Sequence, residues 1–337
     1  MATLDLPPDV FAVVMATGIV SVAARDHAYP RIEAPLAALA AAILVLLVAG
    51  AALQLLLGPA TALARARDPD VGLRLFTFVA ACAVVGACFP THPVVVRTLA
   101  VAAAAAWLVL FPLTLRDVVA STASQLRAHA HGSWLLVSVA TAGLAITAAG
   151  VASSTHRLAW IVVSTAAWAL AVVLYLVVAG LIAWRVATEP FVPEEVTPDS
   201  WILMGALAIT TLAGADLVGA LRAAGPASGS PVWLSDVVRP ATLVLWILAS
   251  TTIPVLVYAE IWRVDHRAGS VHFAGAWWSA VFPLGMYASA TAATAAQLAL
   301  PSLTTISLVM FWIAFSVWVL VTMGWLHSVL RPAGRPS

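Results

Sequence analysis

Four side chains in the run from Gly275 to Ser289 are suited to chemistry inside a membrane, although none of them carries a charge. The run reads Gly-Ala-Trp-Trp-Ser-Ala-Val-Phe-Pro-Leu-Gly-Met-Tyr-Ala-Ser. Helical steps of three and four residues put Ser279, Phe282, Met286 and Ser289 on one face. The sequence therefore predicts a helix face on which hydroxyl groups flank two large apolar side chains.

A proline interrupts this predicted helix next to the aromatic ring. Pro283 cannot donate a backbone hydrogen bond to the carbonyl of Ser279, so we expect a kink there, with Gly285 adding room. A ring beside a kink could close a narrow pore by blocking or dewetting it, which suggests a gate at Phe282. On periodicity alone, an aromatic residue in a membrane helix is more often a packing residue.

Two further pairs of hydroxyl groups fall at helical spacing in other apolar segments. Thr17 and Ser21 are four residues apart, and Ser138 and Thr141 are three apart. Each pair is compatible with a polar stripe on an inner wall. Ser and Thr in membrane helices also bond to helix carbonyls or join neighbouring helices, so both interpretations stay open.

Asp216 is the acidic residue that lies deepest in an apolar segment. Ionisable groups inside a membrane are functional candidates by default, and this carboxyl could bind a proton or a cation. A structural ion pair with Arg222 or Arg239 is the favoured interpretation. Almost all other charged residues fall at segment ends, which leaves no relay of buried carboxylates for a proton pump.

Signals for a metal site, a cofactor or an enzyme are weak. His129 and His131 are two residues apart, but no carboxylate or cysteine cluster accompanies them, so a solvated loop is favoured. Cys82 and Cys88 are six residues apart, on different faces of a helix, and are expected to be buried small apolar residues. The sequence thus predicts no enzyme, no metal and no cofactor.

The composition identifies the class of protein that must position these residues. The chain has 337 residues, of which 63% are hydrophobic and 9% are charged, and its formal net charge is +1. Soluble domains carry roughly 25% charged residues, so this chain cannot cover a water-facing surface. The small net charge also argues against a nucleic-acid partner. We predict an all-α integral membrane protein in the lipid bilayer.

Ten apolar segments have about the length that a membrane helix needs, roughly 20 residues. They run over Pro8–Ala24, Ala34–Leu57, Leu73–Phe89, Val94–Leu115, Ser133–Ala152, Leu158–Trp184, Trp201–Leu221, Val237–Trp262, Gly275–Leu298 and Thr304–Leu330. Only short connections remain, so residues 1–337 form one transmembrane domain. Arginine is more frequent in the connections on the amino-terminal side, which predicts that both termini are cytoplasmic.

Glycine is concentrated in the odd-numbered spans. Glycine lets helix backbones approach closely or lets a cavity pass beside a helix, so we expect the odd-numbered spans to form an inner set and the leucine-rich even-numbered spans an outer set. The residues predicted to line a pathway or kink a helix are Thr17, Gly18, Ser21, Gly86, Ser138, Thr141, Gly143, Gly214, Ser279, Pro283, Gly285 and Ser289.

Three runs of the sequence resemble a known family. Phe11 to Ser21, Trp277 to Gly285 and Trp201 to Ala206 are similar to motifs of the tellurite-resistance/dicarboxylate transporter family, which includes plant slow anion channels and fungal malate and sulfite transporters. The resemblance implies five helical hairpins in pseudo-fivefold order, with odd-numbered helices around a central pore and even-numbered helices outside. It also implies a homotrimer with one pore in each subunit. Phe282 matches the phenylalanine that occludes the pore in this family.

We therefore expect gradient-driven transport of small inorganic anions or C4-dicarboxylates across the cytoplasmic membrane through a phenylalanine-gated pore. Two alternatives within transport are a proton-coupled dicarboxylate carrier and a sulfite- or tellurite-related exporter. The carrier would need a titrating group such as Asp216, His156 or His92. An intramembrane enzyme that uses His129 and His131 is the alternative from another class.

Overall fold

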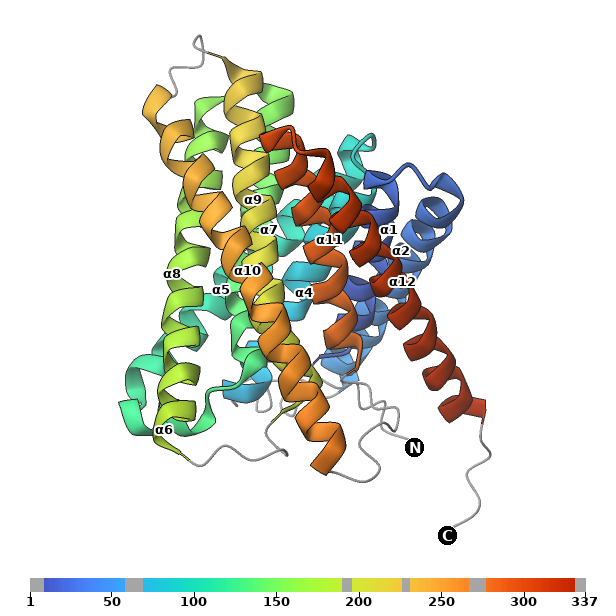
Figure 1. Cartoon of the computed structure of the whole chain (residues 1–337), viewed down its shortest axis with the longest axis vertical. Coiled ribbons are helices and arrows are strands. Elements are labelled where there is room, and N and C mark those ends of the chain that lie inside the picture. Colours follow the sequence, from blue (N-terminus) through green and yellow to red (C-terminus); the bar gives the residue numbers. More distant parts are fainter. Residues whose placement is uncertain (1–8, 58–68, 190–195, 226–230, 267–276, 331–337) are drawn as a thin grey trace.

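The computed structural model describes residues 9–57, 69–189, 196–225, 231–266 and 277–330 (Figure 1). Its helices are α1 (Ala12–Asp26), α2 (Pro30–Leu57), α4 (Pro69–Cys88), α5 (Pro93–Ala120), α6 (Ala123–His129), α7 (Leu136–Thr155), α8 (Leu158–Thr188), α9 (Ile202–Ala224), α10 (Val232–His266), α11 (Trp278–Leu298) and α12 (Pro301–Leu330). Two short 3₁₀ turns, η1 (Gly132–Leu135) and η3 (Pro198–Trp201), precede α7 and α9. No strand occurs in these ranges, which confirms the predicted all-α class.

Eight helices of the described chain are long and apolar enough to cross a membrane: α2, α4, α5, α7, α8, α9, α10 and α12. The helices α1 and α11 do not reach this standard. The described part of α1 has only 15 residues, and α11 contains Pro283 together with several hydroxyl residues and a glutamine. Every predicted span nevertheless corresponds to one helix, although Pro8 and Gly275, at the predicted starts of two spans, lie outside the described residues.

Local sequence signals explain where several helices begin and end. Pro93 begins α5. Its fixed φ angle suits the first turn of a helix, and backbone N–H groups in that turn have no acceptor within the helix, so the missing N–H of proline costs no hydrogen bond. The side chain of Thr122 caps α6, together with Gln125 in a capping box. His156 and Ala299 end α7 and α11 in the left-handed conformation, which turns the chain sharply into the next helix.

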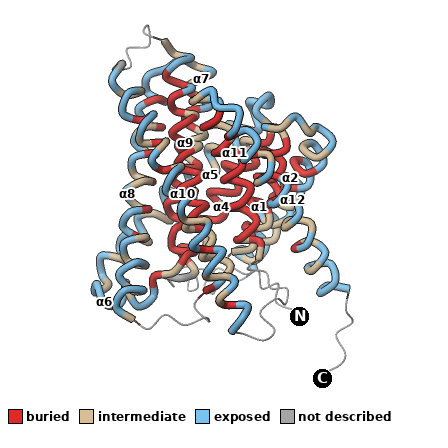
Figure 2. The backbone as a smooth tube through the Cα atoms, in the orientation of Figure 1, coloured by how far each residue is buried: buried red, intermediate tan, exposed pale blue. Residues whose placement is uncertain are grey.

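The helices divide into a buried set and an exposed set (Figure 2). In the most apolar stretches of α4, α7 and α9, 67–78% of residues are buried, against 6–22% in α2, α5, α8, α10 and α12. Nearly all of α1 and α11 is buried as well. The odd-numbered spans are thus the inner ones, as their glycine content indicated.

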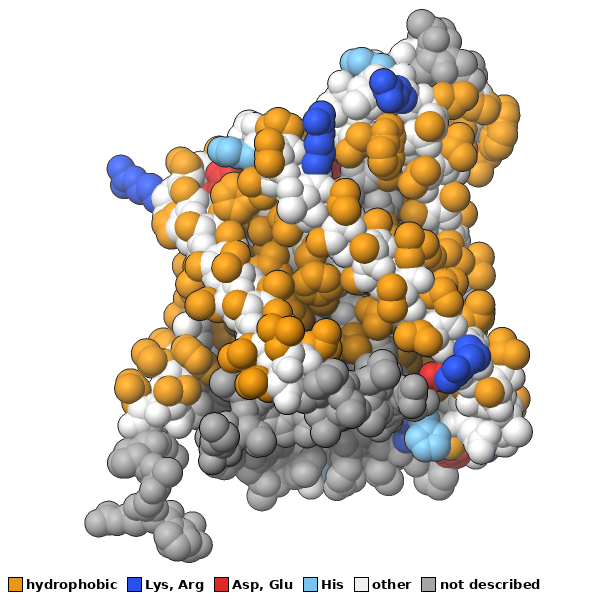
Figure 3. Space-filling view, turned by 180° about the vertical axis from the view of Figure 1, so that it is seen from behind, with side chains coloured by type: hydrophobic (Ala, Val, Ile, Leu, Met, Phe, Trp, Pro, Cys, Tyr) orange, Lys and Arg blue, Asp and Glu red, His pale blue; other side chains and the backbone are white. Residues whose placement is uncertain are grey.

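The five inner helices pack against one another in a closed order. Going around the bundle, α1 contacts α4, α4 contacts α7, α7 contacts α9, and α9 contacts α11. The order closes because α11 also contacts α1. Each inner helix also packs against the outer helix that follows it, so that α2, α5, α8, α10 and α12 surround the inner set. On the face in Figure 3, the charged side chains lie toward the two ends and apolar side chains cover the middle. This distribution fits a surface that faces lipid.

Indole groups of the outer helices link neighbouring helix pairs. The Nε1 atoms of Trp107 (α5), Trp246 (α10) and Trp318 (α12) donate hydrogen bonds to Thr141 of α7, Thr291 of α11 and Thr17 of α1, at 2.9, 3.0 and 3.1 Å. Trp168 of α8 donates to the carbonyl of Thr210 in α9 at 3.0 Å. In each case the acceptor belongs to the next helix pair, so these bonds tie the pairs together.

Glycines set the spacing between inner helices. A Cβ atom on Gly205 of α9 would lie 2.8 Å from Cγ and 3.1 Å from Cα of Pro283 in α11. A Cβ on Gly285 of α11 would lie 2.9 Å from Ile19 of α1, and one on Gly18 would lie 2.7 Å from Val84 of α4. Since real Cβ atoms do not approach this closely, the inner helices can pack at these distances only through glycine.

Gly205→Ala is expected to destabilise the protein by about 1–2 kcal/mol, because the new methyl group overlaps the rigid ring and backbone of Pro283. The midpoint of thermal unfolding in detergent measures the effect. Gly150→Ala is the matched control, because nothing lies within 4 Å of a Cβ at Gly150 and alanine favours a helix. Equal midpoints for the two variants would contradict the proposed packing.

Candidate functional site

One face of α11 runs past two cavities in the middle of the helix bundle. Ser279 and Phe282 line the first cavity, and Met286 and Ser289 line the second. Ser279, Phe282, Met286 and Ser289 therefore lie on one face of α11, as the helical period predicts. Pro283, between the two apolar residues, is buried against Gly205 of α9.

The first cavity, which we call the Arg74 cavity, has a volume of about 340 Å³. Its walls come from α1, α4, α7, α8, α9 and α11 and from the two 3₁₀ turns. Two cationic side chains, Arg74 and Arg185, and the imidazole of His131 line it. Arg74 lies 3.5 Å from Asp9, and the Ser133 N–H donates to Asp199 at 3.0 Å. The cavity is thus polar and contains donors that suit an anion.

The second cavity, which we call the Asp216 cavity, has a volume of about 360 Å³. All five inner helices contribute to it. Its charged lining residues are Arg25 and Asp26 at the end of α1 and Asp216 of α9. Arg25 donates from Nη1 to the carbonyl of Ala87 in α4 at 2.6 Å, which fixes its side chain at the wall.

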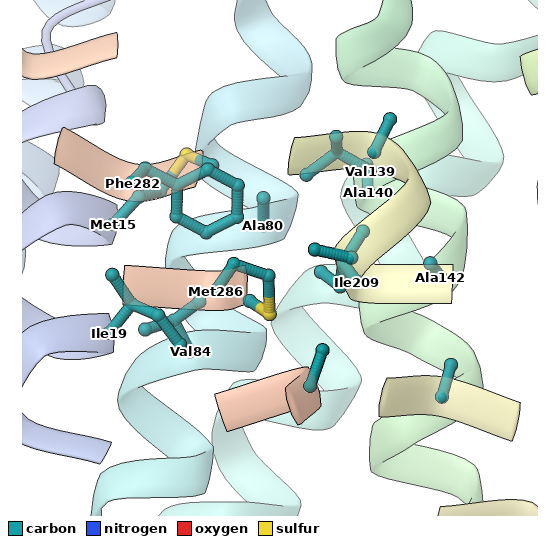
Figure 4. Close-up of a cluster of buried hydrophobic side chains, with 14 of the residues drawn as sticks. Met15, Ile19, Ala80, Val84, Val139, Ala140, Ala142, Ile209, Phe282 and Met286 are labelled. Carbon is teal, nitrogen blue, oxygen red and sulfur yellow. The ribbon is translucent and has the colours of Figure 1, made fainter. Parts of the chain in front are cut away.

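Apolar side chains of α1 and α11 lie where the linings of the two cavities meet, and Figure 4 shows them as one buried cluster. Phe282 and Met286 point from α11 toward the opposite inner helices, and both are at most 2% exposed. Met15 and Ile19 lie one helical turn apart on α1, and each lines the same cavity as its neighbour on α11. We call these four side chains, with Val84 and Ile209, the constriction. No ionisable side chain belongs to it.

Ser289 differs from the other buried hydroxyl residues of the described chain. Its Oγ atom has no close hydrogen-bond partner, whereas the others bond to a carbonyl, an imidazole or an indole. It faces the Asp26 carboxyl in the Asp216 cavity, directly beyond Met286. A buried polar group without a close partner needs an explanation, and a water molecule or anion in the cavity would provide one.

The other predicted hydroxyl residues face away from the cavities. Thr17 accepts the indole N–H of Trp318, and Ser21 donates to the carbonyl of Glu33 at 2.8 Å. Ser138 donates to the carbonyl of Ala171 in α8 at 2.8 Å, and Thr141 bonds within α7 and to the indole of α5. These four hydroxyls join inner helices to outer ones or bond to their own helix. The prediction that these four residues line a pathway is wrong, because none of them lines either cavity.

Of the glycines predicted to line a pathway, some line a cavity and others lie at contacts between helices. Gly143 lines the Asp216 cavity, and Gly86 lines an adjoining cavity of about 540 Å³ between α4, α5, α7 and α9. Gly18 and Gly285 lie at close contacts between inner helices. Gly214 faces outward, since a Cβ there would lie 2.2 Å from Thr242 of α10.

Asp216 does not pair with the arginines that the sequence favoured. Its charged neighbours are Arg25 and Asp26 of α1, while Arg239 donates to the carbonyl of Gln297 at 2.8 Å. Arg222 lies six residues further along α9, which places it on another face of the helix. The contact between Asp216 and α1 joins residues far apart in the chain, and no local pattern indicates it.

The histidines and cysteines occupy structural positions. His131 bonds to Ser133 and to the carbonyl of His129, and His92 and His156 are exposed at helix ends. Cys82 and Cys88 are free and buried, and Cys88 donates to the carbonyl of Gly18. Within the described ranges, no three His, Cys, Asp or Glu residues come together as a metal site.

Sequence reasoning missed several residues of the site. Arg25 and Arg185 entered the sequence analysis only through the distribution of arginine between the two sides, and Asp26 was not selected as a site residue. A signal for the constriction was available, because Met15 and Ile19 lie four residues apart, one helical turn, beside Gly18 in the first span.

The sequence of the chain is similar to those of known membrane proteins. Residues 5–326 match the family described as voltage-dependent anion channel. Two curated relatives are the uncharacterized membrane proteins MT1776 and Rv1735c of Mycobacterium tuberculosis, strains CDC 1551 / Oshkosh and ATCC 25618 / H37Rv. Each is 36% identical over 163 residues, which cover 48% of this chain and 80% of the relative.

Proposed function

Because the chain belongs to the voltage-dependent anion channel family, which comprises the tellurite-resistance/dicarboxylate transporters and plant slow anion channels, we propose that it conducts small anions between its five inner helices. The family supports anion transport by a membrane protein. The observation that carries the finer proposal is the pair of cavities, each lined in part by charged side chains, on either side of the Phe282 and Met286 side chains.

The route begins in the Arg74 cavity, where Arg74 and Arg185 offer donors to an anion beside the carboxylates of Asp9 and Asp199. An anion that leaves this cavity must pass Phe282, where no polar side chain replaces its hydration shell. The apolar ring therefore closes the route by excluding water as well as by filling space. Movement of the ring past Met15 and Met286 opens it.

Beyond the constriction, the Ser289 hydroxyl is the first polar side chain of α11 that lines the Asp216 cavity. It offers a hydrogen bond to the arriving anion without a fixed positive charge. Weak binding of this kind lets the anion leave quickly, as conduction requires. The absence of cationic side chains from the constriction favours channel-like passage over a tightly binding carrier.

We place the protein in the cytoplasmic membrane with both termini cytoplasmic, from the distribution of arginine, and as a homotrimer with a pore in each subunit, from the family resemblance. Exposed apolar side chains on α2, α5, α8, α10 and α12 are compatible with lipid and with neighbouring subunits. Light scattering in detergent measures the mass of the assembly; a monomeric mass would contradict the trimer.

Reconstitution into liposomes tests the proposed function. We expect the purified protein to give a membrane potential that follows the gradient of nitrate or chloride and is indifferent to the cation. Malate and sulfite belong in the same panel, because both cavities are large enough for a C4-dicarboxylate. A potential that follows the potassium gradient would contradict anion conduction.

A proton-coupled dicarboxylate carrier is the second candidate, favoured by the carboxyl of Asp216 in the cavity wall. A carrier of this kind moves protons together with malate, and Asp216→Asn would abolish that coupled movement. A pH-sensitive dye inside the liposomes distinguishes the two functions. Malate flux without proton movement supports the channel.

A further inference from the structure

Carboxyl groups outnumber cationic groups in the Asp216 cavity. Among the residues that line it, two carboxyl groups, those of Asp26 and Asp216, face one guanidinium group, that of Arg25. Asp216 interacts electrostatically with both of the others, so the three charges share one space. With all three groups ionised, the cavity carries one more negative than positive charge.

Neighbouring charges do not cancel this excess. Arg97 of α5 lines the adjoining cavity, but its side chain is exposed, and solvent screens it. Glu33 and His27 lie near Asp26 at the end of α1, and Glu33 adds to the negative side. Asp216 is half-buried, whereas Asp26 is exposed, so the charge of Asp216 acts through a lower dielectric.

Excess negative charge along an anion route has a specific consequence. The repulsion between a fixed charge and a passing ion is proportional to the charge of the ion. A divalent anion is therefore repelled twice as strongly as a monovalent anion of the same size. Arg25 and Ser289 still offer donors to either anion, so the cavity discriminates by charge without being closed to anions.

We propose that Asp216, assisted by Asp26, is a specificity-determining residue that makes the protein select monovalent over divalent anions. This inference rests on the proposed anion route, since it concerns an ion that passes through the Asp216 cavity. The Asp216 carboxyl on the inner helix α9 thus has a role in selecting the substrate.

Perchlorate and sulfate are suitable probes, because they are tetrahedral oxyanions of similar size that differ in charge. Their fluxes are measured in liposomes at about pH 8, because alkaline pH favours the ionised form of both carboxyl groups. The parent is Phe282→Ala, in which the constriction is widened. Hydration also favours perchlorate, so the informative quantity is the change of the perchlorate-to-sulfate ratio on mutation.

In the parent background, Asp216→Asn is expected to lower the perchlorate-to-sulfate ratio roughly three- to ten-fold, as the loss of one unit charge within about 10 Å implies. Asp216→Glu keeps the charge and should keep the ratio. Asp236→Asn is the matched control, because Asp236 is exposed near the start of α10 and lines neither central cavity. Asp26→Asn should change the ratio in the same direction but less.

The possible failures are distinguishable. A ratio unchanged by both Asp216→Asn and Asp26→Asn, with perchlorate flux retained, overturns the charge selection and leaves the anion route intact. If Asp216→Asn does not fold, Asp26→Asn decides on its own: a lowered ratio supports the inference and an unchanged ratio overturns it. Absence of any anion flux in both wild type and parent contradicts the proposed function, and the inference falls with it.

Discussion

Phe282→Ala is expected to raise anion flux through reconstituted protein by ten-fold or more, which corresponds to a barrier lowered by at least ~1.4 kcal/mol. The ring lies between two cavities that each contain charged and hydroxyl side chains, and alanine leaves a wider, hydrated connection. Efflux of nitrate or chloride from loaded liposomes, normalised to the amount of folded protein, measures the change.

Phe315→Ala is the control for this substitution. Phe315 lies on the outer helix α12 and stacks on Trp318, with ring centroids 6.2 Å apart, so its removal alters packing without touching either cavity. We expect it to lower stability and leave the flux unchanged. An equal flux increase in both variants would mean that loosened packing, and not the gate, admits the anions.

Gly132→Ala is expected to lower the free energy of unfolding by about 3 kcal/mol or more. Adding a methyl group to a packed site is most destabilising where the neighbouring atoms are backbone and cannot move aside. A Cβ atom there would lie 2.1 Å from the carbonyl oxygen and 2.6 Å from the carbonyl carbon of Asp199. The two 3₁₀ turns would have to separate, which breaks the bond from Ser133 to Asp199 and opens the wall of the Arg74 cavity.

The midpoint of thermal unfolding of Gly132→Ala, compared with that of Gly219→Ala, measures this cost. Nothing lies within 4 Å of a Cβ at Gly219, so the control should unfold close to wild type. Wild-type stability of Gly132→Ala would show that the two turns do not pack as described.

Much of the fold follows from composition and periodicity. Apolar segments of sufficient length predict the helices, because lipid leaves no other partner for the backbone groups. Glycine content predicts the inner set, because close packing between inner helices admits no side chain at positions such as Gly205 and Gly285. The common face of Ser279, Phe282, Met286 and Ser289 follows from the 3.6-residue period alone.

The direction of the hydroxyl residues did not follow from the sequence. Thr17 and Thr141 lie on inner helices, but an inner helix has neighbours on all sides, and its periodicity does not say which side faces the cavity. Their partners are Trp318 and Trp107, tryptophans in the interior of outer spans. Because an indole N–H in lipid needs an acceptor, such a tryptophan is the available signal that a nearby hydroxyl points outward.

In the proposed mechanism, a single route connects the two cavities and Phe282 closes it. Thiol labelling tests it most directly, with Ser279→Cys and Ser289→Cys placed separately in a chain that carries Cys82→Ala and Cys88→Ala. An anionic, membrane-impermeant thiol reagent is added on the side that the Arg74 cavity faces. We predict that it modifies Ser279→Cys with or without Phe282, but Ser289→Cys only when Phe282→Ala is also present. Equal modification of Ser289→Cys with Phe282 intact, or none after Phe282→Ala, would rule out a route that Phe282 closes.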